Sequence, residues 1–149
     1  MIRILKFLWQ RITRGWDDSE TWGLYDRIAK FTLPRLIRLK ELSVRSGGGV
    51  PLDFVNENNE ANIAEWNNVL DKMIYAFERI VKDDVFDYVI YPPDYVRGFT
   101  LKPNEDGKPY ATHIPNDPRP IDYSKVEEIE AKIQEGLDLF AKYFRSLWW

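Results

Sequence analysis

The sequence predicts a mainly α-helical fold, a bundle of about four helices, and three features indicate it. Apolar residues recur at helical spacing in four separate stretches. Residues that start or stop helices bound these stretches, and a proline-rich segment separates the third from the fourth. The chain has 149 residues and is 44% hydrophobic, which is enough for one core. We expect a single helical domain over residues 1–149, with residues 92–120 as a loop or hairpin arm within it.

The first predicted helix covers residues 2–14 and is amphipathic and basic, with no acidic residue before Asp17. Such a helix can lie on a membrane surface. A chain this short, however, needs every apolar stripe for its core. We therefore expect it to be the first helix of the bundle. Its apolar stripe consists of Ile2, Leu5, Leu8, Trp9 and Ile12.

The second predicted helix covers residues 19–45 and ends before three consecutive glycines. Asp17 or Asp18 is expected to cap its N-terminus, where negative charge suits the helix dipole. Pro34 lies inside the helix and has no N–H to donate, which predicts a kink. The apolar arc consists of Trp22, Tyr25, Ile28, Leu36, Leu39 and Leu42.

The third and fourth predicted helices cover residues 60–82 and 124–147, and Asp122 or Ser124 is expected to cap the fourth. Residues 85–91 could extend the third helix or form a short strand. The stripe of the third helix consists of Ile63, Trp66, Leu70, Met73, Ile74, Phe77, Ile80 and Val81. The stripe of the fourth consists of Val126, Ile129, Ile133, Leu137, Phe140 and Phe144.

Seven of the nine prolines fall in residues 92–120. Asp106-Gly107 separates two short β-prone runs there, which predicts a small hairpin. An insertion of this length is typical of a functional flap or a partner-binding arm.

Composition excludes several classes of function. The chain has no cysteine, which rules out disulfides, thiolate zinc sites and cysteine nucleophiles, and its one histidine, His113, rules out a multi-histidine metal site. It has no Gly-x-Ser-x-Gly, no phosphate-binding loop and no dinucleotide fingerprint. No apolar run approaches the roughly 18 residues of a membrane span. We expect no enzyme, no catalytic residue, no metal and no cofactor.

Charge is distributed unevenly along the chain. Residues 1–46 hold ten Lys and Arg against five Asp and Glu, whereas residues 47–149 hold eleven against nineteen. The acidic part argues against a general DNA-binding protein. A chain with oppositely charged halves can bind an anion at one end or pair with itself. We therefore expect a homo-oligomer.

Arg35 lies between Ile28 and Leu42 on a helical wheel, inside the apolar arc. Its stem could pack while its head reaches solvent or pairs with an acid of the third helix. Alternatively, a buried guanidinium there could bind a phosphate or carboxylate.

Other cations and indoles near Arg35 extend this second interpretation. In a nucleotide site, the cations would bind the phosphate and the indoles would stack on the base. Alternatively, a basic helix face of this kind is only solvated, and the tryptophans pack where the helix begins. The candidate ligand-binding residues are Arg14, Trp16, Trp22, Lys30, Arg35 and Arg38.

Three acids, Asp26, Asp71 and Glu78, lie on neighbouring predicted helices. They could bind magnesium for phosphoester chemistry. Arg27 and Lys30 are available as their ion-pair partners, so ion pairs are the favoured interpretation.

Two blocks of the sequence resemble a family of small uncharacterised proteins of tailed bacteriophages. One block is RGWDD, ETW, IAKF and LPRL within residues 14–36, and the other is LDKMI and AFE within residues 66–78. The resemblance implies a phage source and no particular chemistry. Phage proteins of this size often bind a host molecule and disable it, so we expect a binding protein of the host cytoplasm that sequesters an immune signalling nucleotide. The first alternative function is inhibition of a host protein. The second alternative is a metal-dependent phosphohydrolase.

Overall fold

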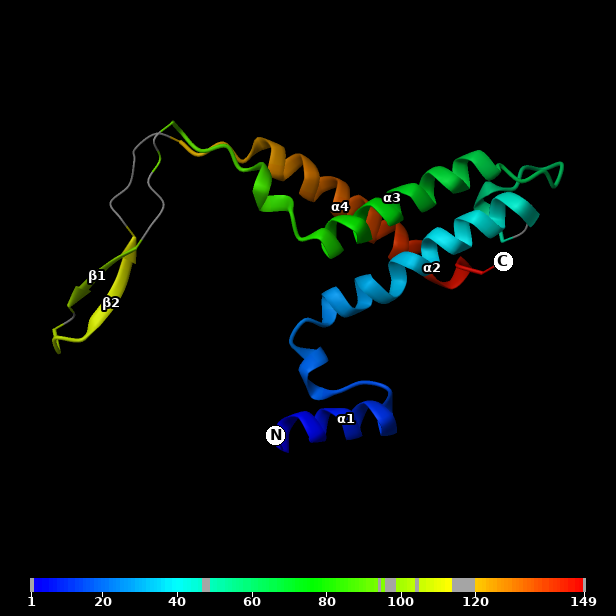
Figure 1. The fold of residues 1–149 in the computed structure, drawn as a ribbon. Coiled ribbons are helices and arrows are strands. Elements are labelled where there is room, and N and C mark those ends of the chain that lie inside the picture. The colour runs from blue at the N-terminus through cyan, green and yellow to red at the C-terminus, as the bar shows by residue number, and fades with distance from the viewer. Residues whose placement is uncertain are drawn as a thin grey trace.

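The fold is mainly helical, as predicted (Figure 1). The computed structural model describes residues 2–46, 49–93, 95, 99–103, 105–113 and 120–148. The described part of the chain contains four α-helices, joined by short 3-10 turns. They are α1 (Ile2–Arg14), α2 (Leu24–Ser46), α3 (Ile63–Lys82) and α4 (Ser124–Tyr143).

Helix α3 lies at the centre of the bundle and packs against both α2 and α4. Its apolar stripe repeats every three or four residues along the whole helix, so it can face two neighbours at once. Trp66, Leu70 and Met73 are fully buried. Asn62 begins the helix, because its side chain accepts a hydrogen bond from the N–H of Glu65. The prediction of this helix is confirmed.

Helices α3 and α4 approach each other most closely at Gly136. A Cβ atom at this position would lie 2.3 Å from the carbonyl oxygen of Lys72 and 2.6 Å from the Cβ of Ala76. Both distances are far below van der Waals contact, so only glycine fits between the two backbones.

Three aromatic side chains close the core where the start of α3 meets the end of α4. Phe54, Trp66 and Tyr143 pack with ring centroids 5.4 to 5.5 Å apart. Phe54 comes from a short 3-10 turn, Leu52–Phe54, in the connection between α2 and α3. This connection is therefore attached to the core.

Helix α2 begins at Leu24, not at residue 19 as predicted. Asp17 caps a separate 3-10 turn, η1 (Asp18–Thr21), by accepting a hydrogen bond from Ser19 N. The buried side chains of α2, Ala29, Leu36, Leu39 and Ser43, face α3.

The predicted apolar arc of α2 is only partly buried. Trp22, Tyr25 and Ile28 are 94%, 63% and 47% exposed. The first turns of α2 lead away from α3 and α4 toward α1, so no helix covers this side (Figure 1). Helix α2 continues through Pro34.

The expectation that the first helix packs its stripe on the core is wrong. Helix α1 lies apart from the bundle and packs against η1 (Figure 1). Most of its apolar side chains are exposed. Leu8 and Trp9 are 54% and 64% exposed, whereas Gln10, on the opposite face, is buried. The polar face is the one that η1 covers.

The proline-rich insertion leaves the bundle between α3 and α4. Strands β1 (Phe99–Pro103) and β2 (Pro109–His113) pair antiparallel, and Gly107 in the turn has a φ of +75°. Before the insertion, Val85–Tyr88 form a 3-10 turn in place of the expected helix extension or strand, and Ile90 then bridges to Asp122. The expectations for residues 94, 96–98, 104 and 114–119 lie outside the described residues, as do those for Gly47, Gly48 and Trp149.

No helix within the described residues is both long and apolar enough to cross a membrane.

Candidate functional site

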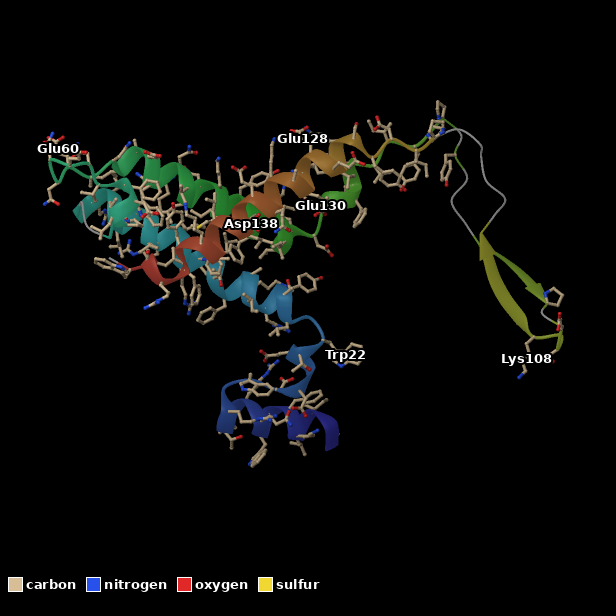
Figure 2. The ribbon with its side chains drawn as sticks, turned by 180° about the vertical axis from the view of Figure 1, so that it is seen from behind. Trp22, Glu60, Lys108, Glu128, Glu130 and Asp138 are labelled. Atoms are coloured by element: carbon tan, nitrogen blue, oxygen red, sulfur yellow. The ribbon has the colours of Figure 1, made fainter. Side chains whose placement is uncertain are left out.

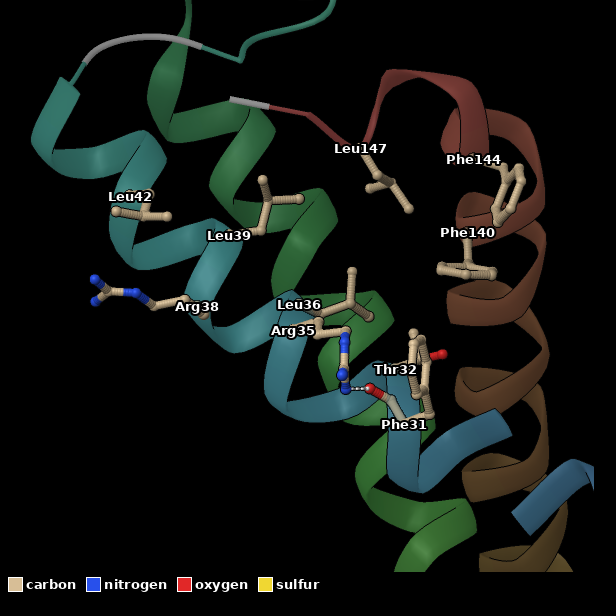
Figure 3. A pocket seen from close by; sticks show the side chains of 10 residues that line it. All are labelled: Phe31, Thr32, Arg35, Leu36, Arg38, Leu39, Leu42, Phe140, Phe144 and Leu147. Carbon is tan, nitrogen blue, oxygen red and sulfur yellow. Dashed lines mark hydrogen bonds between the residues drawn. The ribbon is translucent and has the colours of Figure 1, made fainter. Parts of the chain in front are cut away.

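A groove of about 450 Å³ runs between α2 and the C-terminal end of α4 (Figure 3). One wall comes from α2, and the opposite wall comes from α4 and the turn that follows it. Its floor and walls are mostly apolar, with arginines on the α2 side. The lining residues are Phe31, Thr32, Arg35, Leu36, Arg38, Leu39, Leu42, Phe140, Phe144 and Leu147.

Arg35 lies at the mouth of this groove and is exposed, so its guanidinium is not buried in the core. Nη1 donates a hydrogen bond to the carbonyl oxygen of Phe31 at 2.6 Å, and the guanidinium carbon lies 3.6 Å from the centroid of the Phe31 ring (Figure 3). No acid of α3 pairs with it, and no other carboxylate of the described residues does. The cation is held in place by main chain and ring while its charge stays unneutralised.

Arg38 contributes its stem to the groove, and its head points away from the α4 wall (Figure 3). Its Nη1 pairs with Glu41 at 2.8 Å, and the two side chains are 57% and 54% exposed. An exposed pair of this kind contributes little stability. The pair with Glu41 therefore does little to hold the Arg38 head in its present position.

The α4 wall is aromatic. Phe140 and Phe144 are one helical turn apart with ring centroids 5.6 Å apart, and Phe140 also packs edge-on against Phe77 of the core. Phe144 is 63% exposed. The two rings are inclined at 71° to each other, so a flat apolar group could lie on one of them while an anionic group reaches Arg35. Such a groove is suited to a ligand with an apolar body and an anionic end.

The other predicted ligand-binding residues do not line this groove. Arg14 pairs with Asp18 at 2.8 Å, and its guanidinium stacks 4.3 Å from the Trp16 ring. Lys30 pairs with Asp26 at 2.9 Å. The expectation of one pocket that combines both indoles with all four cations is therefore corrected.

Trp22 borders a second, separate cavity, which it shares with Lys6, Phe7, Asp18 and Ser19. The side chain is almost fully exposed, as Figure 2 shows. The structure thus brings Arg35 and Arg38 to one groove, and it leaves Arg14, Trp16 and Trp22 with η1.

Electrostatic contacts hold α1 to η1. Hydrogen bonds from Gln10, and then from Lys6 and Arg14, hold the pKa of Asp18 far below its ordinary value. Hydrogen bonds from Ser19, with Arg11 at 2.5 Å, lower the pKa of Asp17. Both carboxylates stay ionised, and they offset part of the positive charge on the basic face of α1.

The three acids considered for magnesium do not form a site. Asp26 pairs with Lys30, and Asp71 pairs with Lys40 at 2.5 Å. Within the described ranges, no group of three or more Asp, Glu or His side chains could hold a metal ion.

The aromatic wall and the surroundings of a further arginine, Arg79, were not predicted from the sequence. The i, i+4 spacing of Phe31 to Arg35 and of Phe140 to Phe144 signals such pairs on a helix.

Arg79 is 15% exposed and binds both carboxylate oxygens of Asp84, at 2.9 and 2.8 Å. Hydrogen bonds to Tyr75 and Tyr88 raise its pKa further. Because Arg79 has its own carboxylate, it joins α3 to the turn that follows and is not available to a ligand.

No protein-family model, no curated protein and no solved structure matches this chain. Its function must therefore be inferred from its own residues.

Proposed function

We propose that the protein is a phage-encoded, non-enzymatic binding protein that sequesters a phosphate-bearing small molecule in the groove between α2 and α4. The ligand class that fits best is a signalling nucleotide of host immunity. In this proposal Arg35 binds the phosphate, Arg38 assists, and the base lies on Phe140 or Phe144.

The observation that carries the proposal is the unpaired guanidinium of Arg35 beside an apolar groove. Arg79, whose side chain is 15% exposed, has Asp84 as its carboxylate partner, whereas Arg35 has none among the described residues. A cation next to apolar walls binds an anion more strongly than one in open water, because the local dielectric constant is lower. Arginine also matches the geometry of phosphate oxygens.

The resemblance to phage proteins supports the setting, since a nucleotide sponge acts in the host cytoplasm and needs no reaction. The proposal includes a homo-oligomer, as the charge distribution favours. The residue set differs from the one predicted from sequence: it keeps Arg35 and Arg38, replaces the indoles by phenylalanines, and leaves out Arg14 and Lys30.

Titration calorimetry with a panel of cyclic mononucleotides and cyclic dinucleotides tests the proposal. We expect one member to bind more tightly than about 100 μM, roughly −5.5 kcal/mol. Arg35→Gln should weaken that binding by roughly 10- to 100-fold, because a hydrogen bond to a charged group contributes about 1.5–3 kcal/mol. Arg27→Gln is the matched control, since Arg27 is exposed on the same helix outside the groove. If no nucleotide of the panel binds within this limit, the proposal is wrong.

A host protein as the ligand is the second candidate, and the exposed apolar side chains of α1 and of the start of α2 favour it. Purification from infected or host cells separates the two candidates. A small molecule released by heat supports the first, and one stoichiometric host protein supports the second.

A further inference from the structure

Helix α1 presents an apolar face that nothing in the described chain covers. Ile4, Leu5, Leu8, Trp9 and Ile12 are between 54% and 76% exposed. All five lie on one side of the helix, since their spacing follows the helical repeat. An amphipathic helix with this pattern is normally stabilised by a neighbour on its apolar side.

The helix cannot simply turn this face inward. Its polar side is already fixed to η1: Gln10 is buried and exchanges two hydrogen bonds with Asp18, at 2.8 and 3.1 Å. Lys6 and Arg14 reach the same carboxylate at 2.9 and 2.8 Å. Rotating α1 would break all of these contacts, so its apolar face stays outward.

The size of the face fits a protein interface. The exposed fractions of the five add up to about three whole apolar side chains, which is a patch of several hundred Å². Monomers rarely expose apolar patches larger than a few hundred Å². A stable dimer needs about 800 Å² from each partner.

We propose that the occupant of this face is the α1 helix of a second copy of the chain. The stripe is complementary to itself when two helices run antiparallel about a two-fold axis at Leu8. The two Leu8 side chains then face each other, and Ile4 of each helix lies opposite Ile12 of the other. No charged residue lies within the stripe, so no like charges are brought together.

A lipid surface fits this helix less well. Interfacial helices bind anionic lipid through free basic side chains on their polar face. Here Lys6, Arg11 and Arg14 are each paired with Asp17 or Asp18 of η1. This pairing weakens the electrostatic attraction to a bilayer and has no effect on contact between two apolar stripes.

The proposed function includes a homo-oligomer, and the dimer proposed here rests on the proposed function in that respect alone. Its surface is separate from the α2–α4 groove, so each can fail without the other. Nucleotide calorimetry reports on the groove, whereas the experiments below report on α1.

Analytical ultracentrifugation over a range of concentrations tests the dimer. The wild-type chain should sediment at twice its mass of 17.7 kDa. Leu8→Glu should raise the dissociation constant roughly 100-fold, because two carboxylates would meet at the axis. Leu52→Glu makes the same replacement at an exposed leucine of another turn and should leave the dimer intact. Circular dichroism should show unchanged helix content and melting of the bundle for both variants.

The absence of cysteine from the chain permits a test of geometry. Leu8→Cys should form a disulfide between copies under mild oxidation, since the two positions face each other within disulfide range. Ile12→Cys should not, because its two copies lie about 12 Å apart along the axis. Three results would each overturn the inference. The wild-type chain could be a monomer, Leu8→Glu could leave the dimer unchanged, or cross-linking could occur at position 12 but not at position 8. A monomer that floats with vesicles of phosphatidylcholine and phosphatidylglycerol through Leu8 would also overturn it.

Discussion

Gly136→Ala tests how closely α3 and α4 pack. The added methyl carbon would lie 2.3 Å from the Lys72 carbonyl oxygen and 2.6 Å from the Ala76 Cβ. The nearest atom belongs to the backbone, so a side-chain rotation cannot relieve the contact. The two helices must move apart instead.

The magnitude follows from two opposing effects. Overpacking a core costs about 1–3 kcal/mol. Alanine in place of glycine within a helix returns roughly 1 kcal/mol. We therefore expect a net loss of up to about 2 kcal/mol, or a melting temperature lower by up to roughly 8 °C for a chain of this length.

Thermal and urea unfolding, followed by circular dichroism, measure this loss. Gly23→Ala is the matched control, because no atom lies within 4 Å of a Cβ at Gly23 and its φ is not in the left-handed region. It should be neutral or slightly stabilising. If Gly136→Ala is as stable as Gly23→Ala, the close approach of α3 and α4 is wrong.

Three further predictions concern the core, a helix start and the α1 contact. Trp66→Ala should lower the free energy of unfolding by about 3–5 kcal/mol in urea titrations, because the side chain is fully buried; a loss below 1 kcal/mol would contradict its place in the core. Asn62→Ala should cost about 1 kcal/mol in the same assay through loss of the cap on α3, and no change would exclude that cap. The lowered pKa values of Asp17 and Asp18 make the α1–η1 contact stable above their ordinary value of 3.8 and weaker as pH falls below it. Amide exchange of α1 should thus show constant protection between about pH 5 and 8, and loss of protection in that range would contradict the ion pairs.

Helix α3 could be predicted from sequence because its stripe runs along its whole length and both sides of it are covered. Helix α1 has an equally clear stripe, but its position in the fold could not be predicted. Periodicity identifies the apolar side of a helix and does not identify what covers that side. The covering element here is η1, and it binds the polar face.

Arg35 illustrates the same limit within the site. The helical wheel places it among apolar residues, and burial was a reasonable expectation. The neighbouring side chains on that side, Ile28 and Phe31, are themselves 47% and 61% exposed. The arginine therefore lies at the surface of a groove.

The opposite wall of that groove could not be found from the α2 sequence. Phe140 and Phe144 lie about a hundred residues further along the chain, and only the packing of α2 and α4 around α3 brings them near Arg35. Lys30 shows the reverse case. Its spacing to Asp26 already predicted the ion pair that the structure contains.

A crystal structure of the protein with its tightest-binding nucleotide tests the central claim most directly. The account predicts a phosphate within hydrogen-bond distance of the Arg35 guanidinium and a base against Phe140 or Phe144, with the helices in place. A nucleotide bound beside Trp22 or at the proline-rich hairpin, with the α2–α4 groove empty, would contradict it.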